Sequence, residues 1–211
     1  MGDAKVILIG RLLSPFVRRV LVTLNVYGIE CQRNPLTTAS DGAAIAELNP
    51  LGRVPALVLD DGETLIDSIA IVDYLDDLVG PQRALVPASG KARRDALKLL
   101  ALAVGVAEKA VVAHYEKNRR PEDKFWDQWF DHCCAQVQGG LAALEAAAPA
   151  DGGWLIGDKM SQVDITTAVT CEFISEVLPG LIGADAYPRL KAIAARMNQI
   201  EAFSSTHPSR D

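Results

Sequence analysis

The alternation of strand-like and helix-like patterns in residues 1–80 constrains the fold more than any other feature of the chain. The apolar, β-branched run Lys5–Gly10 predicts a buried strand. Pro15 suits the first turn of a helix, and the apolar periodicity after it predicts a helix to about Tyr27, closed by Gly28. Glu30–Asn34 predicts a second strand. These elements form a strand–helix–strand unit.

The next part of the chain adds a short helix, a hairpin and a further helix. Ala43–Leu48 is a helix candidate, and Ala56–Leu59 and Glu63–Ile66 are apolar runs that flank the turn Asp60-Asp61-Gly62. From Ser68 to Leu78 the apolar residues again follow a helical period. This order of elements is that of a thioredoxin-like domain.

A segment rich in glycine and proline, Gly80–Gly90, separates this region from an almost entirely helical one. We therefore predict an α+β chain with a thioredoxin-like domain at residues 1–80, a linker at 81–90 and an all-helical domain at 91–211. The helices expected in the last region are Lys91–Asn118, Glu122–Ala147, Gln162–Leu178 and Pro188–Gln199.

Composition and charge exclude several classes of protein. The net charge is −6 and no segment is strongly basic, which disfavours a nucleic-acid partner. The longest apolar run, Leu99–Ala107, is shorter than the roughly 20 residues of a membrane span. The cysteines form no C-x-x-C pair and His132-Cys133-Cys134 lacks zinc-ligand spacing, which disfavours a metal site. Lys5 and Arg11 interrupt the first apolar stretch, which disfavours a signal peptide. We expect a cytoplasmic protein without metal or membrane partners.

Ser14-Pro15-Phe16 has two interpretations. A serine before a proline is a common helix cap, so the motif can be purely structural. The same geometry places a hydroxyl at the positive end of a helix, where it can donate a hydrogen bond to an anion. A thiolate is one such anion, and it is the nucleophilic form of a thiol.

Two further motifs also have a structural and a functional interpretation. Val54-Pro55 can be an ordinary turn, or a cis bond that turns the Val54 backbone outward to pair with an extended peptide. Asp67-Ser68 can simply cap a helix. Alternatively, the helix start and the Ser68 hydroxyl hold a carboxylate while Asp67 meets an ammonium group.

Taken together, Ser14–Val20, Asn49–Pro55 and Asp67-Ser68 resemble the glutathione-binding half of the cytosolic glutathione transferases. Trp154–Asp158 and Ser161–Asp164 resemble the signature of that family's helical domain, where Ser161-x-x-Asp164 also reads as a capping box. The resemblance covers essentially the whole chain. It implies the glutathione transferase fold, glutathione as a substrate, no metal, and a homodimer.

The resemblance also assigns roles to particular residues. The Ser14 hydroxyl would bind the glutathione sulfur, as in the serine-type transferases, and because position 14 is not cysteine we expect no thiol-transferase activity. Arg53 stands where a lysine is often found near the glycyl end. The implied glutathione-binding residues are Phe16, Arg53, Val54, Pro55, Asp67 and Ser68, and the implied electrophile pocket is Leu12, Glu108, Val111, His114 and Tyr115.

The favoured function is therefore a glutathione S-transferase that attacks a small electrophile, with a role in detoxification. Two alternatives stay open. A glutathione-dependent isomerase or dehalogenase would use the same site. A non-enzymatic module with this fold would bind a protein partner, because fold alone does not settle function.

Overall fold

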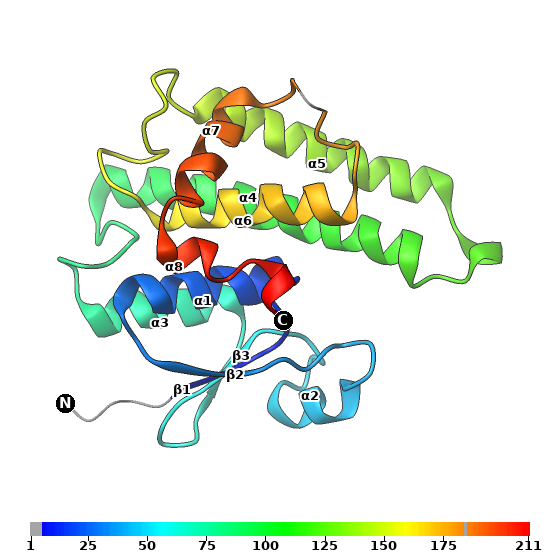
Figure 1. The fold of residues 1–211 in the computed structure, drawn as a ribbon, viewed down its shortest axis with the longest axis horizontal. Helices are drawn as coiled ribbons and strands as arrows, with labels where there is room; N and C mark the ends of the chain where they lie inside the picture. Colours follow the sequence, from blue (N-terminus) through cyan, green and yellow to red (C-terminus); the bar gives the residue numbers. More distant parts are fainter. Residues whose placement is uncertain (1–5, 184) are drawn as a thin grey trace. The chain divides into compact units, whose positions relative to one another are not determined.

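The computed structural model describes residues 6–183 and 185–211, so Lys5, expected at the start of the first strand, lies outside the described residues. The described chain forms two compact units. The first unit contains the residues up to Ala88 together with Asn198–Asp211, and the second contains Ser89–Met197 (Figure 1). The fold is a thioredoxin-like α+β domain and an all-helical domain, as the sequence predicts.

A four-stranded sheet of order β2-β1-β3-β4 forms the centre of the first unit. Its strands are β1 (Val6–Ile9), β2 (Cys31–Asn34), β3 (Ala56–Val58) and β4 (Thr64–Leu65). β1 pairs in parallel with β2 and antiparallel with β3, and β3 and β4 form the expected hairpin. Ile9 lies opposite Ala56 in this register, so the residues that follow β1 meet those that precede β3.

Helices cover the sheet of the first unit. α1 (Pro15–Tyr27) and α3 (Ser68–Val79) pack against each other on one face, and α2 (Gly42–Leu48) lies on the other side (Figure 1). α1 begins at Pro15 with Ser14 as its N-cap and ends at Gly28, whose φ of 68° is left-handed, as the sequence predicts. The apolar face of α1 is buried through Val17, Val20, Leu21 and Leu24.

The segment expected to be a linker is anchored on the first unit. The Tyr27 hydroxyl donates to Asp76 on α3, and the Leu85 N–H donates to the Tyr27 oxygen at 2.8 Å. The Val86 N–H donates to Asp76 Oδ2 at 3.0 Å. Burial and the Asp76 hydrogen bond raise the pKa of Tyr27, so its hydroxyl stays protonated and can hold both partners.

Four main helices build the second unit: α4 (Gly90–Asn118), α5 (Asp127–Ala147), α6 (Gln162–Val177) and α7 (Pro188–Met197). α4 packs on α5 and α6, and α6 packs on α7. α4 and α5 approach so closely at Gly140 that an added Cβ would lie 2.2 Å from Val106 Cγ2. Among residues 6–183 and 185–211, no helix combines the length and apolar character needed to span a membrane.

The helix expected from Glu122 begins later than the sequence pattern suggests. Glu122–Lys124 forms only a short 3₁₀ turn (η1), and α5 begins at Asp127. The reason is a side-chain contact: the Trp126 N–H donates to Glu116 Oε1 at 3.0 Å while the Trp126 backbone is extended. The last expected helix is also shorter, since α7 ends at Met197 and is followed by α8 (Glu201–Ser204).

The last fourteen residues group with the first unit, whereas the sequence pattern placed all of 91–211 in one helical domain. Arg18 on α1 donates through Nε to Thr206 Oγ1 at 3.1 Å, and its guanidinium carbon lies 4.5 Å from the centre of the Phe203 ring. The Arg18 side chain is almost fully buried by this contact. α8 and the residues after it therefore pack beside α1 (Figure 1).

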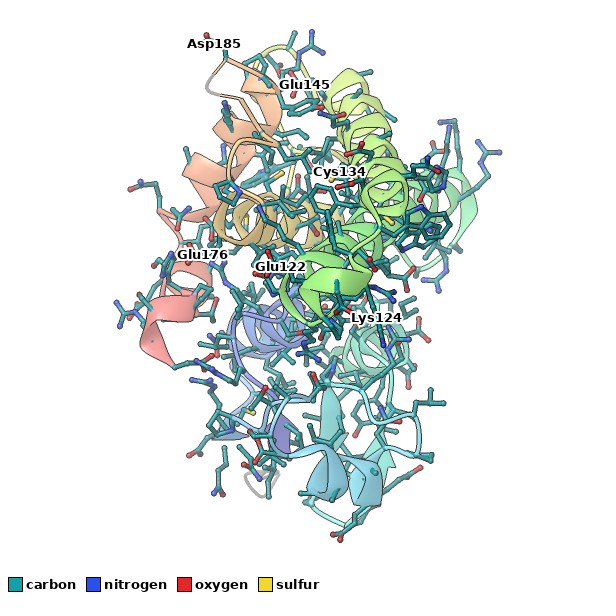
Figure 2. The ribbon with its side chains drawn as sticks, turned by 90° about the vertical axis from the view of Figure 1, so that its right-hand side faces the viewer. Glu122, Lys124, Cys134, Glu145, Glu176 and Asp185 are labelled. Atoms are coloured by element: carbon teal, nitrogen blue, oxygen red, sulfur yellow. The ribbon has the colours of Figure 1, made fainter. Side chains whose placement is uncertain are left out.

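Carboxylates hold two helix starts in the second unit: Asp164 is buried and Glu145 is half-buried. Asp164 accepts from the Leu155 N–H at 2.8 Å, the Ser161 N–H at 2.9 Å and the Ser161 hydroxyl at 2.7 Å. This is the predicted capping box of α6. Glu145 of α5 accepts from the N–H groups of Arg189 and Leu190, both at 3.0 Å, at the start of α7 (Figure 2).

Ser161→Ala should lower the free energy of unfolding by about 1 kcal/mol, because it removes the N-cap hydroxyl. Urea denaturation measures this loss as a lower midpoint concentration, with the slope of the unfolding free energy against urea concentration (m) unchanged. Ser175→Ala is the matched control on the same helix, where the hydroxyl only donates back to Cys171 O at 3.0 Å and its loss should cost little. Equal losses for the two variants would contradict the capping role.

Candidate functional site

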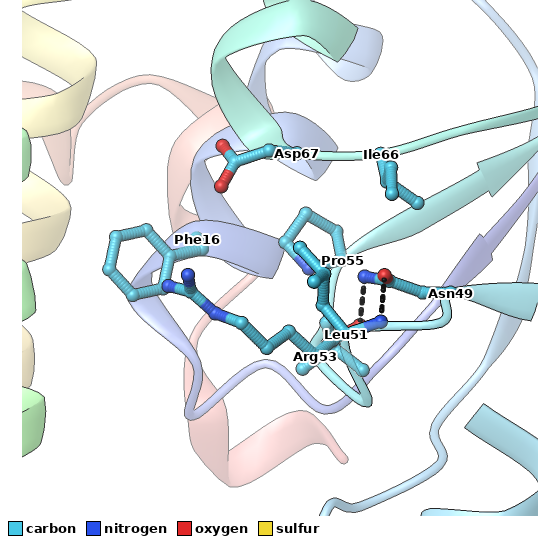
Figure 3. A pocket seen from close by; sticks show the side chains of 8 residues that line it. Phe16, Asn49, Leu51, Arg53, Pro55, Ile66 and Asp67 are labelled. Carbon is cyan, nitrogen blue, oxygen red and sulfur yellow. Dashed lines mark hydrogen bonds between the residues drawn. The ribbon is translucent and has the colours of Figure 1, made fainter. Parts of the chain in front are cut away.

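A pocket in the first unit collects residues from all three motifs of the N-terminal region (Figure 3). Five predicted glutathione-binding residues line it: Phe16, Arg53, Val54, Pro55 and Asp67. The other lining residues are Asn49, Leu51 and Ile66. Segments up to fifty-one residues apart in sequence, from Phe16 to Asp67, thus converge on one hollow.

Ser14 lies at the start of α1 and is half-buried. Its Oγ accepts a hydrogen bond from the Val17 N–H at 3.4 Å. It donates to no atom of the described residues, so its proton remains available. The cap interpretation and the functional interpretation are thus compatible, because the same hydroxyl can accept from the helix and donate to an anion.

Gly10 allows three segments to meet beside Ser14. Its φ is +125°, and an added Cβ would lie 2.5 Å from Val17 Cγ2 and 2.9 Å from Val54 Cβ. Only a residue without a side chain fits both this backbone conformation and this contact. Gly10 therefore brings the end of β1, the first turn of α1 and the loop before β3 together.

Asn49 holds the loop that leads to Val54. Its Oδ1 accepts from the Leu51 N–H at 3.0 Å, and its Nδ2 donates to Arg53 O at 2.8 Å (Figure 3). The Val54-Pro55 peptide bond is cis. Among the described residues, no hydrogen bond uses the Val54 N–H or C=O, so both can pair with a ligand. Sequence reasoning assigned Asn49 no role, although an asparagine in a turn is a signal for such local bonds.

Charges of opposite sign face the pocket. In Figure 3 the Asp67 carboxylate and the Arg53 side chain both face the hollow. Asp67 is the N-cap of α3, where Oδ1 accepts from the Ile69 N–H at 3.0 Å. Arg53 is exposed and forms no ion pair within the described part of the chain. A zwitterionic ligand would find a partner for each of its charges.

Ser68 lies at the base of α3, behind the pocket lining, and only 1% of its surface is exposed. Its Oγ accepts from Arg19 Nη1 at 3.1 Å. Arg19 is also buried, and burial lowers the pKa of its guanidinium to about 10, while the negative charge of Asp67 acts in the opposite direction. Sequence reasoning missed Arg19, because its partner is 49 residues away in the chain.

Four of the five residues predicted for an electrophile pocket lie on α4. Glu108 and Tyr115 are exposed, and Val111 and His114 are half-buried. The His114 ring centre lies 5.9 Å from that of Tyr115. Burial, and after it the positive charge of Arg119, lower the pKa of His114, so this imidazole is neutral at pH 7.

The fifth residue, Leu12, is buried in the first unit. Its N–H donates to Asp211 Oδ2 at 2.5 Å. Asp211 also forms an ion pair with Arg33 and lies 3.6 Å from Arg11 Nε. The C-terminal segment thus fixes the loop that leads to Ser14, a contact across 199 positions that no local sequence signal announces.

Within residues 6–183 and 185–211, no group of three His, Cys, Asp or Glu side chains is arranged to hold a metal ion. The polar groups that line the pocket are the Asn49 amide, the Val54 backbone and the charged side chains of Arg53 and Asp67.

Gly10→Ala should lower the free energy of unfolding by at least about 2 kcal/mol, because it adds overpacking to a strained backbone. Gly62→Ala is the matched control: Gly62 also has a positive φ of 90°, yet an added Cβ would meet nothing within 4 Å. Urea unfolding followed by circular dichroism measures both. A similar loss for the two variants would show that the contact at Gly10 contributes nothing.

Comparisons with known proteins show which family the chain resembles. The family model "Glutathione S-transferase, N-terminal domain" matches residues 8–83, and the model of the C-terminal domain matches residues 127–196. The chain is 32% identical to maleylacetoacetate isomerase from Pseudomonas aeruginosa over 199 residues, which cover 90% of each protein.

Solved structures are similar over nearly the full length. A glutathione transferase family member from Pseudomonas fluorescens Pf-5, with bound glutathione, has a TM-score of 0.85 and 34% identity, covering 96% of this chain and 98% of that one. A glutathione S-transferase from Methylobacillus flagellatus KT, also with glutathione bound, has a TM-score of 0.87 and 29% identity, covering 95% and 98%.

Proposed function

Because the chain belongs to the glutathione S-transferase family, we propose that it binds glutathione in the pocket of the first unit and that Ser14 stabilises the glutathione thiolate for attack on a small electrophile. The observation that carries this proposal is the pocket itself. It combines an unpaired backbone edge at Val54 with opposite charges at Arg53 and Asp67.

Glutathione is an extended tripeptide, and the Val54 backbone suits its middle. A peptide that lies along Val54 can exchange hydrogen bonds with its N–H and C=O, as an added strand does. The exposed Arg53 guanidinium would then meet the glycyl carboxylate. At the other end, Asp67 would meet the ammonium group of the γ-glutamyl residue, and Ser68 and the first N–H groups of α3 would meet its carboxylate.

In this placement the sulfur of glutathione would lie at the start of α1, near Ser14. A free thiol has a pKa of about 8.5 and is mostly protonated at neutral pH. The Ser14 proton and the positive end of the α1 dipole both stabilise the thiolate. Each unit by which they lower the thiol pKa corresponds to about 1.4 kcal/mol. The thiolate then forms a bond to the electrophilic carbon, and the leaving group departs with its electron pair.

A second candidate function is a glutathione-dependent isomerisation, favoured by the relative named maleylacetoacetate isomerase at 32% identity. The same thiolate would add to one carbon of a double bond, the resulting single bond would rotate, and the thiolate would leave again. Ser14 would serve both reactions. A substrate panel that contains cis-configured unsaturated acids and alkylating electrophiles separates the two.

For the electrophile we propose the face of α4 that carries Glu108, Val111, His114 and Tyr115. The neutral His114 and the aromatic Tyr115 suit an uncharged or aromatic group. The family also supports a cytoplasmic homodimer with a role in detoxification, which we retain as part of the proposal.

Ser14→Ala should lower kcat about 10- to 100-fold, because a hydrogen bond to a charged group contributes about 1.5–3 kcal/mol. Glutathione affinity should change little, since the ends of the peptide are held elsewhere. Steady-state kinetics with a panel electrophile and calorimetric titration with glutathione and S-methylglutathione measure the two effects.

Ser161→Ala is the control for the loss of a helix cap in itself. Equal turnover in Ser14→Ala would remove Ser14 from the mechanism, and no binding of either ligand to the native chain would overturn the proposed function.

A further inference from the structure

A buried cation lies directly behind the start of α3. Arg19 is on the second turn of α1, only 3% of its surface is exposed, and its Nη1 donates to Ser68 Oγ at 3.1 Å. A buried charge costs several kcal/mol unless other groups compensate it. Arg19 thus places a positive charge directly behind the Ser68 hydroxyl.

The Ser68 hydroxyl is hydrogen-bonded to this charge. It accepts from Arg19 and donates to no atom of the described residues. A hydroxyl has one proton to donate and two lone pairs that accept, and here the bond from Arg19 uses one of those lone pairs. Because residues 6–183 and 185–211 supply no acceptor, the proton is left for a ligand next to the first N–H groups of α3.

Two charges lie near the Ser68 hydroxyl. Burial lowers the pKa of the Arg19 guanidinium to about 10, and the negative charge of Asp67 acts in the opposite direction. The Asp67 carboxylate is itself engaged by the Ile69 N–H at 3.0 Å and faces the pocket (Figure 3). A carboxylate bound at Ser68 would add the negative charge that stabilises Arg19.

We propose that Arg19 is a positioning residue for the carboxylate of a γ-glutamyl group: it orients and polarises the Ser68 hydroxyl, and so makes the site selective for thiols that carry an α-amino acid at this end. The inference rests on the proposed binding of glutathione. Arg19 does not touch the ligand. It supplies the positive charge of a pair whose negative member, Asp67, meets the ammonium group of the same α-amino acid.

A purely structural role for Arg19, as a tie between α1 and α3, predicts a different result. It would change the stability of the unit and weaken the binding of every ligand alike. The carboxylate role predicts that the effect depends on one ligand group. The quantity that separates the two roles is therefore a ratio measured in each variant: the dissociation constant of a ligand without the α-carboxylate divided by that of glutathione.

The experiment is calorimetric titration with glutathione and with 4-aminobutanoyl-cysteinyl-glycine, which keeps the amine and lacks the α-carboxylate. In the native chain we expect glutathione to bind about 10- to 100-fold more tightly than the analogue. In Arg19→Met this ratio should fall several-fold through weaker glutathione binding, because the Ser68 hydroxyl and the first N–H groups of α3 remain but the charge behind them is lost, and Arg19→Lys should recover part of it. A ratio that stays at the native value in Arg19→Met would overturn the proposal.

Arg18→Met is the matched control. Arg18 is the neighbouring residue and is equally buried, but it contacts Thr206 and Phe203. Its removal should leave the ratio at the native value. If Arg19→Met does not fold, Arg19→Gln is the second variant: it removes the charge while keeping a side-chain N–H, and the ratio should fall below the native value there too. Failure of the native chain to bind glutathione would overturn the proposed function, whereas native binding with an unchanged ratio in the folded Arg19 variants would overturn this inference alone.

Discussion

The site depends on one close approach, where β1, α1 and the loop before β3 meet at Gly10. A side chain there would lie 2.5 Å from Val17 Cγ2 and 2.9 Å from Val54 Cβ. This contact fixes the first turn of α1, and with it Ser14, at a set distance from the unpaired Val54 backbone. The thiol position and the peptide-binding edge are therefore set by packing, before any ligand arrives.

Two serines in this frame share the same arrangement. Ser14 Oγ accepts from the Val17 N–H, and Ser68 Oγ accepts from Arg19. In each case the hydroxyl accepts from a donor inside the fold and donates to no atom of the described residues, so its proton is left for an anion. The two hydroxyls thus suit the two negative groups that glutathione would bring, the thiolate and the γ-glutamyl carboxylate. Preorganised donors of this kind stabilise charge without reorganisation.

The order of elements in the first unit could be predicted because each rests on local signals, such as Pro15 and Gly28 at the ends of α1. The contacts that complete the site could not, because they join distant positions. Arg19 meets Ser68 across 49 residues, and Asp211 meets Leu12 across 199. The start of α5 was predicted too early, since the contact between the Trp126 N–H and Glu116 leaves no local pattern. On α4, residues that pack and residues that bind share the same helical periodicity, so the sequence pattern did not separate the roles of Val111 and His114.

The most direct test of this account is the thiol pKa of bound glutathione, followed by the ultraviolet absorbance of the thiolate in a pH titration of the saturated protein. The account predicts a pKa well below the value of about 8.5 for a free thiol, because the Ser14 proton and the α1 dipole both favour the thiolate. A bound thiol that titrates like free glutathione would contradict it.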